Sequence, residues 1–433
     1  MSWGFENDPE YQKTLDWVQE FVDNEVAPLD FIVHPYDMKD PLRNALIKPL
    51  QEQVKAKGMW ATHLGKELGG QGYGQVQLAL LNEIVGGTAA GPIVFGAQAP
   101  DSGNSEILAH FGTPELKERY LEPLINNEIV SCYAMTEPQG GSNPLEFKTT
   151  ARKDGDEWVI SGEKWFGSNA VNASFFIIMV VTDPDADHHN KLSMFVVPAD
   201  TPGIEIVRDV ATWGHDSTQG GHAYTRWNDV RIPADHILGE VGQGFHVAQT
   251  RLGGGRIHHA MRTVGIMKKA LDMMASRAVS RQTRGKLLGQ NQMVQEMLAD
   301  SWIDLEQFRL LVLRTAWRID KYKDYRKVVQ DIAAVKAAMP GAYQRVIQRA
   351  IQLHGSLGAS QELPLGRWLQ DAATMGLVDG ATELHKMSVS RELLKNYAPD
   401  PELFPHYHLP KLREAAQQKY AKEIAEFRGE SEH

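Results

Sequence analysis

The densest group of side chains that could bind a ligand is the run 133–143 of this 433-residue chain. It offers hydroxyls at Thr136 and Ser142, and the adjacent glycines Gly140 and Gly141 let backbone amides approach a ligand closely. A loop that joins two domains would have the same composition. The residues of this run alone favour neither interpretation.

Two further stretches carry side chains suited to chemistry. Arg281, Arg284 and Lys286 form a cationic cluster that could bind a pyrophosphate, although such clusters are more often a solvated surface. Asp379 precedes Gly380 in a turn-like segment, where a carboxylate could accept a proton. Without further information, an aspartate in this setting is more often an ordinary turn residue.

These stretches lie within three successive parts of the chain, which are predicted to be helical, then stranded, then helical again. Apolar residues recur at helical spacing over 11–26, and a second helix is predicted over 76–85. After Cys132 the chain reads as short strands, predicted at 149–152, 158–160, 175–181, 192–198, 203–207 and 223–227. From about Gly244 to near Phe427 the pattern is helical again, with breaks expected at Gly285, Pro340-Gly341 and Gly355. The order predicts an α+β protein.

Composition narrows the class of function. The chain has 45 basic and 55 acidic residues, a net charge of −10, which disfavours nucleic-acid binding. The apolar run 175–181 is too short to span a membrane, which takes about 20 residues. With Cys132 as the single cysteine and an acidic amino terminus, we expect a cytoplasmic protein without a disulfide. His258 and His259 are adjacent, so they do not share a helical face and no metal is expected there.

Several of these stretches resemble, in the same order, the motifs of the acyl-CoA dehydrogenase family. The segment 136–143 resembles the T-E-P-x-x-G-S-D signature, with Asn143 in place of Asp. Further similar segments are 162–169, 255–265, 281–288 with Gln292, 352–358, and 378–383. Arg284 replaces a usual Phe and Ser356 a common Gly. The resemblance covers about residues 15–395 and is strongest to the subfamily with an aspartate base, typified by family members 10 and 11.

This resemblance implies a bound FAD and an acyl-CoA substrate. The residues that it implies for FAD are Met135, Thr136, Phe166, Ser168, Arg281, Arg284, Gln292, Gln352, Gly355, Ser356, Ala381 and Glu383. Those implied for the substrate are Ser142, Arg256 and Gly380. The 352–356 segment would meet the FAD of a neighbouring subunit. A homo-oligomer is therefore implied, at least a dimer and, in this family, a dimer of dimers.

The resemblance also places Asp379 at the position of the family's catalytic carboxylate. The α C–H of a thioester is a weak acid, so a base must remove that proton as hydride leaves the β carbon. Desolvation by substrate and flavin is expected to raise the pKa of such a carboxylate. Some relatives carry the base just before the helix arginine, but that position is Gly255 here, which leaves Asp379.

The implied fold has an N-terminal helical domain (1–132), a middle β-barrel or sandwich (133–243) and a C-terminal four-helix bundle (244–433). The implied activity is an FAD-dependent α,β-dehydrogenation within fatty-acid β-oxidation, with an electron-transfer flavoprotein as electron acceptor. Three alternatives remain open: a nitroalkane oxidase, an acyl-CoA oxidase, and a flavin-bearing scaffold without turnover.

Overall fold

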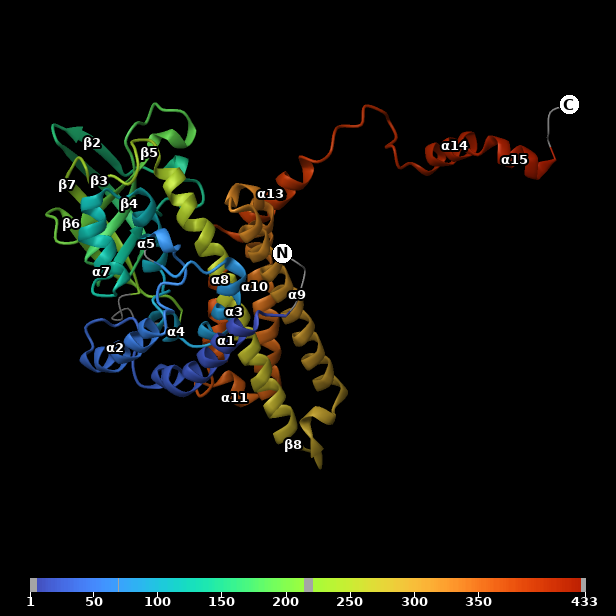
Figure 1. Cartoon of the computed structure of the whole chain (residues 1–433), viewed down its shortest axis with the longest axis horizontal. Coiled ribbons are helices and arrows are strands. Elements are labelled where there is room, and N and C mark those ends of the chain that lie inside the picture. The colour runs from blue at the N-terminus through green and yellow to red at the C-terminus, as the bar shows by residue number, and fades with distance from the viewer. Residues whose placement is uncertain (1–5, 69, 214–220, 430–433) are drawn as a thin grey trace. The chain divides into compact units, whose positions relative to one another are not determined.

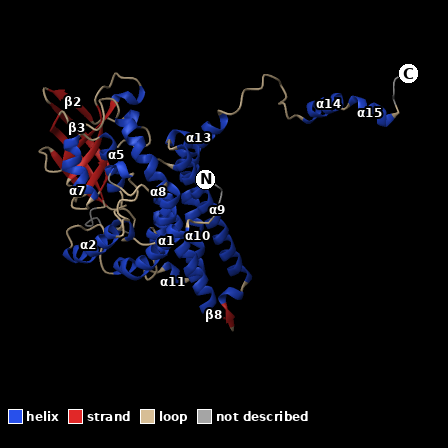
Figure 2. Cartoon of the chain, in the orientation of Figure 1, coloured by secondary structure: helices blue, strands red, loops and turns tan. Residues whose placement is uncertain are grey.

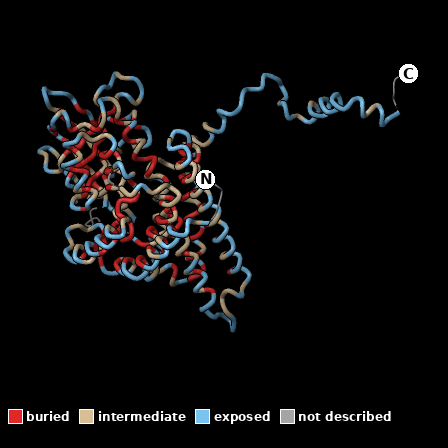
Figure 3. The backbone as a smooth tube through the Cα atoms, in the orientation of Figure 1, coloured by how far each residue is buried: buried red, intermediate tan, exposed pale blue. Residues whose placement is uncertain are grey.

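A computed structural model describes residues 6–68, 70–213 and 221–429 (Figure 1). Its contacts divide the chain into two compact units, Met1–Val389 and Ser390–His433. Residues 390–429 include no buried position, whereas the first unit contains all the buried ones (Figure 3). The two units are therefore described separately.

The first unit begins with helices, of which the earlier ones share one core and the later ones pack against the strands that follow. The carboxylates of Asp8 and Asp40 accept hydrogen bonds from backbone amides, and a proline follows each of them, which fixes the starts of α1 and α2. The helix expected over 11–26 is α1, continued by a π-helical segment, Val22–Val26. The α-helices are α1 Pro9–Phe21, α2 Pro41–Ala56, α3 Gln75–Val85, α4 Gly91–Val94, α5 Asp101–Phe111, α6 Pro114–Leu116 and α7 Glu122–Ile125.

A seven-stranded sheet follows (Figure 2, red). Its strands are β1 Ser131–Ala134, β2 Thr150–Asp154, β3 Glu157–Ser168, β4 Phe175–Val181, β5 Leu192–Pro198, β6 Ile204–Val210 and β7 His222–Pro233. Strand β1 pairs with both β4 and β3, and β2 pairs with the same two strands, so four strands form a closed ring. This ring is the barrel-like element that the strand pattern predicts.

Strand β4 is apolar throughout because both of its faces are buried. Phe175, Ile177 and Met179 pack with helices α5 and α8, whereas Phe176 and Ile178 pack inside the sheet. Alternate side chains of a strand point to opposite faces, so a strand buried on both faces needs an unbroken apolar run.

The rest of the first unit is a helical bundle. It contains α8 Gly244–Ser280, α9 Gln292–Tyr322, α10 Val329–His354, α11 Ser356–Ala359 and α12 Leu365–Thr374, with a hairpin of β8 Gln282–Thr283 and β9 Lys286–Leu287 between α8 and α9. Helices α8, α9 and α10 pack on one another, α12 packs on α10, and α3 packs on α8 and α9.

One predicted break is wrong. Pro340 and Gly341 lie inside α10, which continues to His354. Buried neighbours on both sides of this point, Met339 and Tyr343, hold the helix in the core, and this packing outweighs the backbone hydrogen bond that a proline removes. Breaks at Gly285 and Gly355 are observed, and both glycines have positive φ.

The second unit holds the end of α13, Thr382–Leu394, with α14 Leu409–Lys419 and α15 Ala421–Arg428. The domain boundaries 1–132, 133–243 and 244–433 stay predictions. Within the described residues, no helix is both long and apolar enough to cross a bilayer. Nor does any group of three His, Cys, Asp or Glu side chains in that part of the chain have metal-binding geometry.

Candidate active site

Asp379 lies in the turn between α12 and α13 and is held there through its main chain. Its backbone has a positive φ of 54°. Nε of Arg256 donates a 2.9 Å hydrogen bond to the Asp379 carbonyl, and Nε2 of His385 lies 3.3 Å from the same oxygen. These contacts leave the carboxylate free to point away from the turn. Its side chain is 17% exposed.

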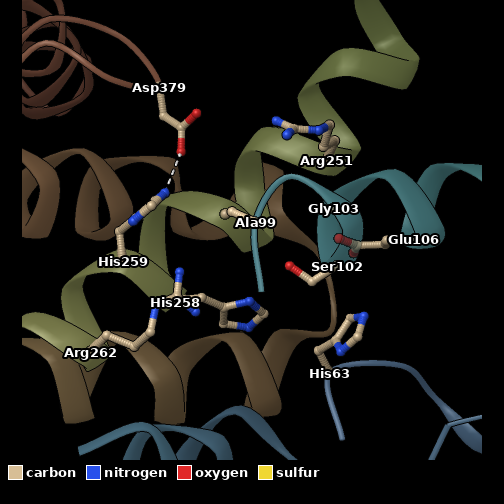
Figure 4. Close-up of a pocket in the computed structure, with 11 residues that line it drawn as sticks. His63, Ala99, Ser102, Gly103, Glu106, Arg251, His258, His259, Arg262 and Asp379 are labelled. Atoms are coloured by element: carbon tan, nitrogen blue, oxygen red, sulfur yellow. Dashed lines mark ion pairs between the residues drawn. The ribbon is translucent and has the colours of Figure 1, made fainter. Parts of the chain in front are cut away.

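The carboxylate of Asp379 faces a small cavity of about 40 Å³ (Figure 4). Oδ2 of Asp379 lies 3.5 Å from Nε2 of His259, on α8. The cavity is lined by His63, Ala99, Ser102, Gly103, Glu106, Arg251, Gly255, His258, His259, Arg262 and Asp379. Helices α5 and α8 therefore supply most of its wall.

Charges near Asp379 favour its ionised form. Burial raises the pKa of the carboxyl, but the neighbouring His259, Arg251, Arg256 and Lys336 outweigh burial and lower it overall. The expected rise in this pKa concerns the protein with substrate and flavin bound, and it stays a prediction. Burial and the charge of Arg262 lower the pKa of His259 to about 4, so at pH 7 this imidazole is neutral and the cations near Asp379 are Arg251, Arg256 and Lys336.

Gly255 supplies room for this carboxylate. A Cβ built on Gly255 would lie 3.3 Å from Oδ2 of Asp379. Any larger side chain at Gly255 would therefore crowd the group that faces the cavity.

Two of the residues expected to bind substrate lie near Asp379, and one does not. Arg256 contacts the Asp379 main chain and Gln249 Oε1, so its guanidinium holds the turn rather than lining the cavity. Gly380 follows Asp379 with a φ of 100°, and a Cβ there would lie 3.0 Å from His385 Nε2. Ser142 is exposed in the loop after β1, outside the cavity wall.

Four of the residues expected to contact the flavin gather where β1 meets β3. The backbone N–H of Trp165 donates to the Thr136 carbonyl at 2.9 Å, next to Met135. Phe166 has a φ of 60°, and its exposed ring lies beside His222. Oγ of Ser168 is 3.0 Å from Nδ1 of His222. Tyr133, in β1 beside this group, has its ring centroid 3.9 Å from the guanidinium of Arg251, which lines the cavity.

A second set of residues expected to bind FAD lies at the other end of the bundle. Arg281, Arg284, Gln292, Gln352, Gly355 and Ser356 are all exposed at the ends of α8 and α10 and the start of α9. Ser280 lies about 36 Å along α8 from Arg256, at 1.5 Å per residue. One chain therefore does not bring this set to Asp379. Ala381 and Glu383, by contrast, directly follow the Asp379 turn.

The residues present fit FAD. Arg281 and Arg284 pair with no carboxylate in the described part of the chain, so their donors are available for a pyrophosphate. A Cβ built on Gly355 would meet no atom within 4 Å, so its exposed backbone is open to a ligand.

Sequence reasoning missed most of the cavity wall. Arg251, Gly255, His259 and Arg262 recur at helical spacing on one face of α8. That spacing is a usable signal for a shared face, but the sequence alone assigns a place in the site only to Arg256 and, as a vacant position for the base, Gly255. Glu106, Ser102 and His63 have no local signal, because they come from other elements.

The chain matches three family models in succession. They are the acyl-CoA dehydrogenase N-terminal domain (residues 8–128), middle domain (132–230) and C-terminal domain (242–394). The probable acyl-CoA dehydrogenase FadE2 of Mycobacterium tuberculosis is 37% identical over 87% of this chain and 92% of that protein. Acyl-CoA dehydrogenase family member 11 of Rattus norvegicus is 36% identical over 89% of this chain.

The chain spans about half the length of family member 11 and 37% of Mus musculus family member 10. The solved structure of a putative acyl-CoA dehydrogenase from Mycobacterium abscessus is 35% identical, with a TM-score of 0.85 over 91% of this chain and all of that one. These matches confirm the resemblance and the fold read from the motifs. The chain belongs to the acyl-CoA dehydrogenase family, whose members are FAD-dependent oxidoreductases.

Proposed function

We propose that this protein removes two hydrogens from the α and β carbons of an acyl-CoA thioester, giving the trans-2-enoyl-CoA. The observation that carries the proposal is the carboxylate of Asp379, which faces a cavity between α5 and α8. In this proposal Asp379 takes the α proton and the β hydrogen leaves as hydride. Bound FAD supplies the hydride acceptor.

The protein's own groups prepare Asp379 for this step. Arg256 and His385 fix the turn through its carbonyl, so the carboxylate needs little reorganisation. The surrounding cations keep the carboxylate ionised and able to accept a proton. Substrate binding displaces water from the cavity, which strengthens the basicity of a carboxylate.

We propose that two groups of side chains hold FAD. Met135, Thr136, Phe166 and Ser168 would contact the flavin end, and Ala381 and Glu383 lie near it. The exposed set at the far end of the bundle would hold the FAD of a second copy, because about 36 Å separates it from Asp379 within one chain. Ser142 and Gly380 would contact the CoA and acyl parts of the substrate.

This arrangement supports a homo-oligomer. The exposed face of α9 carries Trp302, Ile303 and Leu310, which a second copy would cover. Sedimentation of the FAD-bound protein should give at least a dimer. An electron-transfer flavoprotein is the proposed partner that reoxidises the flavin.

Anaerobic titration of the FAD-bound protein with acyl-CoA thioesters tests the function. Loss of the flavin absorbance band with an acyl-CoA is the expected result. Rapid oxygen consumption with acyl-CoA would indicate an oxidase, and peroxide release with nitroethane but no bleaching by thioesters would indicate a nitroalkane oxidase. No bleaching by either, with a duplex DNA mobility shift at physiological salt, would indicate a scaffold.

The lowered pKa of Asp379 predicts the pH dependence of the reaction. A base with a depressed pKa stays deprotonated until the pH falls through that pKa, so activity is lost only below the ordinary aspartate value of 3.8. We expect kcat/KM for flavin reduction to stay level from neutral pH to that value. Stopped-flow pH jumps measure it, and a fall in kcat/KM with an apparent pKa above 3.8 would contradict the prediction.

Arg256→Gln is expected to slow flavin reduction by about 10- to 100-fold, the effect of losing one hydrogen bond from a charged donor. The Asp379 carbonyl would lose its 2.9 Å partner, so the carboxylate would occupy its reactive position less often. The carboxylate itself remains, so one titration should still be seen, moved to higher pH because Arg256 is one of the charges that lower the Asp379 pKa. An unchanged rate at saturating substrate would show that the turn holds its geometry without Arg256.

A further inference from the structure

The wall of the cavity beyond Asp379 is cationic and rich in hydrogen-bond donors. It contains two guanidinium groups, Arg251 and Arg262, and the imidazoles of His63, His258 and His259. An unsubstituted alkyl chain offers no partner for any of them. If the acyl chain enters this cavity, the polar groups of the wall need partners that such a chain does not supply.

Two imidazole nitrogens of this wall have no hydrogen-bond partner among the described residues, although the other nitrogen of His63, Nε2, lies 3.2 Å from Ser105 Oγ. Nδ1 of His63 and Nε2 of His258 are buried without a hydrogen bond in the described part of the chain. Arg262 forms no ion pair with any carboxylate in that part, in contrast to Arg309 and Arg314, which each pair with one. Leaving such groups unsatisfied beside a hydrocarbon chain would be unfavourable, because each has lost its hydrogen bonds to water.

The charges that line the cavity are also unbalanced. Two guanidinium groups face a single ionised carboxylate, Asp379. Burial raises the pKa of Glu106 to about 8, so this carboxyl is largely protonated at pH 7. Burial and Arg262 lower the pKa of His63 and His258, so both are neutral. One net positive charge is left in the cavity.

The cationic Arg262 and the neutral imidazoles of His63 and His258 line the same cavity. The rings of His63 and His258 lie on the same side of the cavity, with Ser102 above and between them (Figure 4). Arg262 lies on α8 one helical turn beyond His259, about 5 Å further along the helix. The cavity volume of about 40 Å³ is roughly that of three waters, at 10–15 Å³ each, and would hold a carboxylate group.

We infer that the preferred substrate carries an oxyanion on its acyl chain, a carboxylate a few carbons beyond the reacting pair, bound by Arg262, His258 and His63. This inference rests on the proposed function, because it needs the thioester end of the chain to lie beside Asp379. The anion would provide the missing counter-charge of Arg262 and acceptors for the two imidazoles. Neither the dehydrogenation step nor the hydride acceptor changes.

Pairs of acyl-CoA thioesters of matched chain length, added to the FAD-bound protein, test the inference. The rate of flavin reduction is compared for glutaryl-CoA and adipyl-CoA against pentanoyl-CoA and hexanoyl-CoA, which have the same chain lengths and end in a methyl group. We expect kcat/KM to favour the carboxylated thioesters by at least about tenfold, the effect of a single charge-assisted contact. Equal rates, a preference for the methyl-terminated thioesters, or a greater preference for a hydroxylated chain would each overturn the inference.

Variants then locate the anion site. Arg262→Gln should remove the preference by lowering only the rates for carboxylated thioesters, and His258→Gln should reduce it. Lys269→Gln is the matched control, because this cation lies two turns along α8 and donates to the Gly87 carbonyl outside the cavity. Equal losses for both kinds of thioester in Arg262→Gln would contradict the assignment.

The inference can fail separately from the proposed function. If methyl-terminated thioesters alone reduce the flavin, the function stands and the inference is wrong. If no thioester reduces it, the function is wrong, and calorimetry with non-reducible thioether analogues of both kinds still tests the preference for charge. Tighter binding of the carboxylated analogue by wild type, lost in Arg262→Gln, would support the anion site.

Discussion

Asp379→Asn is expected to slow the reduction of bound FAD by acyl-CoA by about 10²- to 10⁴-fold, the typical cost of losing a general base. Asparagine has the same shape, and the contacts of Arg256 and His385 are to the main chain, so the turn should keep its geometry. An amide cannot accept the α proton. Stopped-flow measurement of flavin bleaching under anaerobic conditions gives the rate.

The FAD content and a variant of a second, exposed carboxylate provide the controls for Asp379→Asn. FAD content should equal that of wild type, because Asp379 is not among the residues proposed to hold the cofactor. Glu362→Gln removes an exposed carboxylate from the loop before α12 and should bleach at the wild-type rate. Bleaching of Asp379→Asn at that same rate would require a different base, and Glu106 is the other carboxyl in the cavity.

The order of elements was readable from the sequence because each class has its own period. The helical spacing over 11–26 marks α1, and the apolar run 175–181 marks β4, from local pattern alone. The closing of the ring of strands was not readable in the same way. It depends on Tyr133 pairing with Ser168 and Thr150 with Val181, contacts between residues more than 30 positions apart.

The site was predictable only where a motif marks it. Asp379 could be singled out from the turn that contains it, but its electrostatic setting could not. The cations that lower its pKa come from α8 and, for Lys336, from α10, so only the packing of these helices against the turn reveals them. Burial alone would raise the pKa of Asp379, but in the protein without substrate the charges that the fold brings near it outweigh burial.

The buried ion pair between Lys164 and Glu137 should be the costliest to break. Both side chains are at most 1% exposed, and Nζ of Lys164 lies 2.8 Å from Oε1 of Glu137. The ammonium also donates to the Met135 carbonyl at 2.9 Å, so it ties β3 to the loop proposed to hold the flavin. The Glu137 carboxylate in turn accepts hydrogen bonds from the backbone amides of Lys148 and Thr149.

Lys164→Met is therefore expected to lower the free energy of unfolding by about 3–5 kcal/mol, because it leaves a buried carboxylate without its counter-charge. Denaturant unfolding of the FAD-bound protein measures this loss, and weaker FAD retention should accompany it. Lys153→Met, at an exposed position of β2, should change stability by less than about 0.5 kcal/mol. The double variant with Glu137→Gln should recover part of the loss, because the remaining side chains are then neutral. A loss as small as that of Lys153→Met would mean that the backbone amides alone compensate the buried carboxylate.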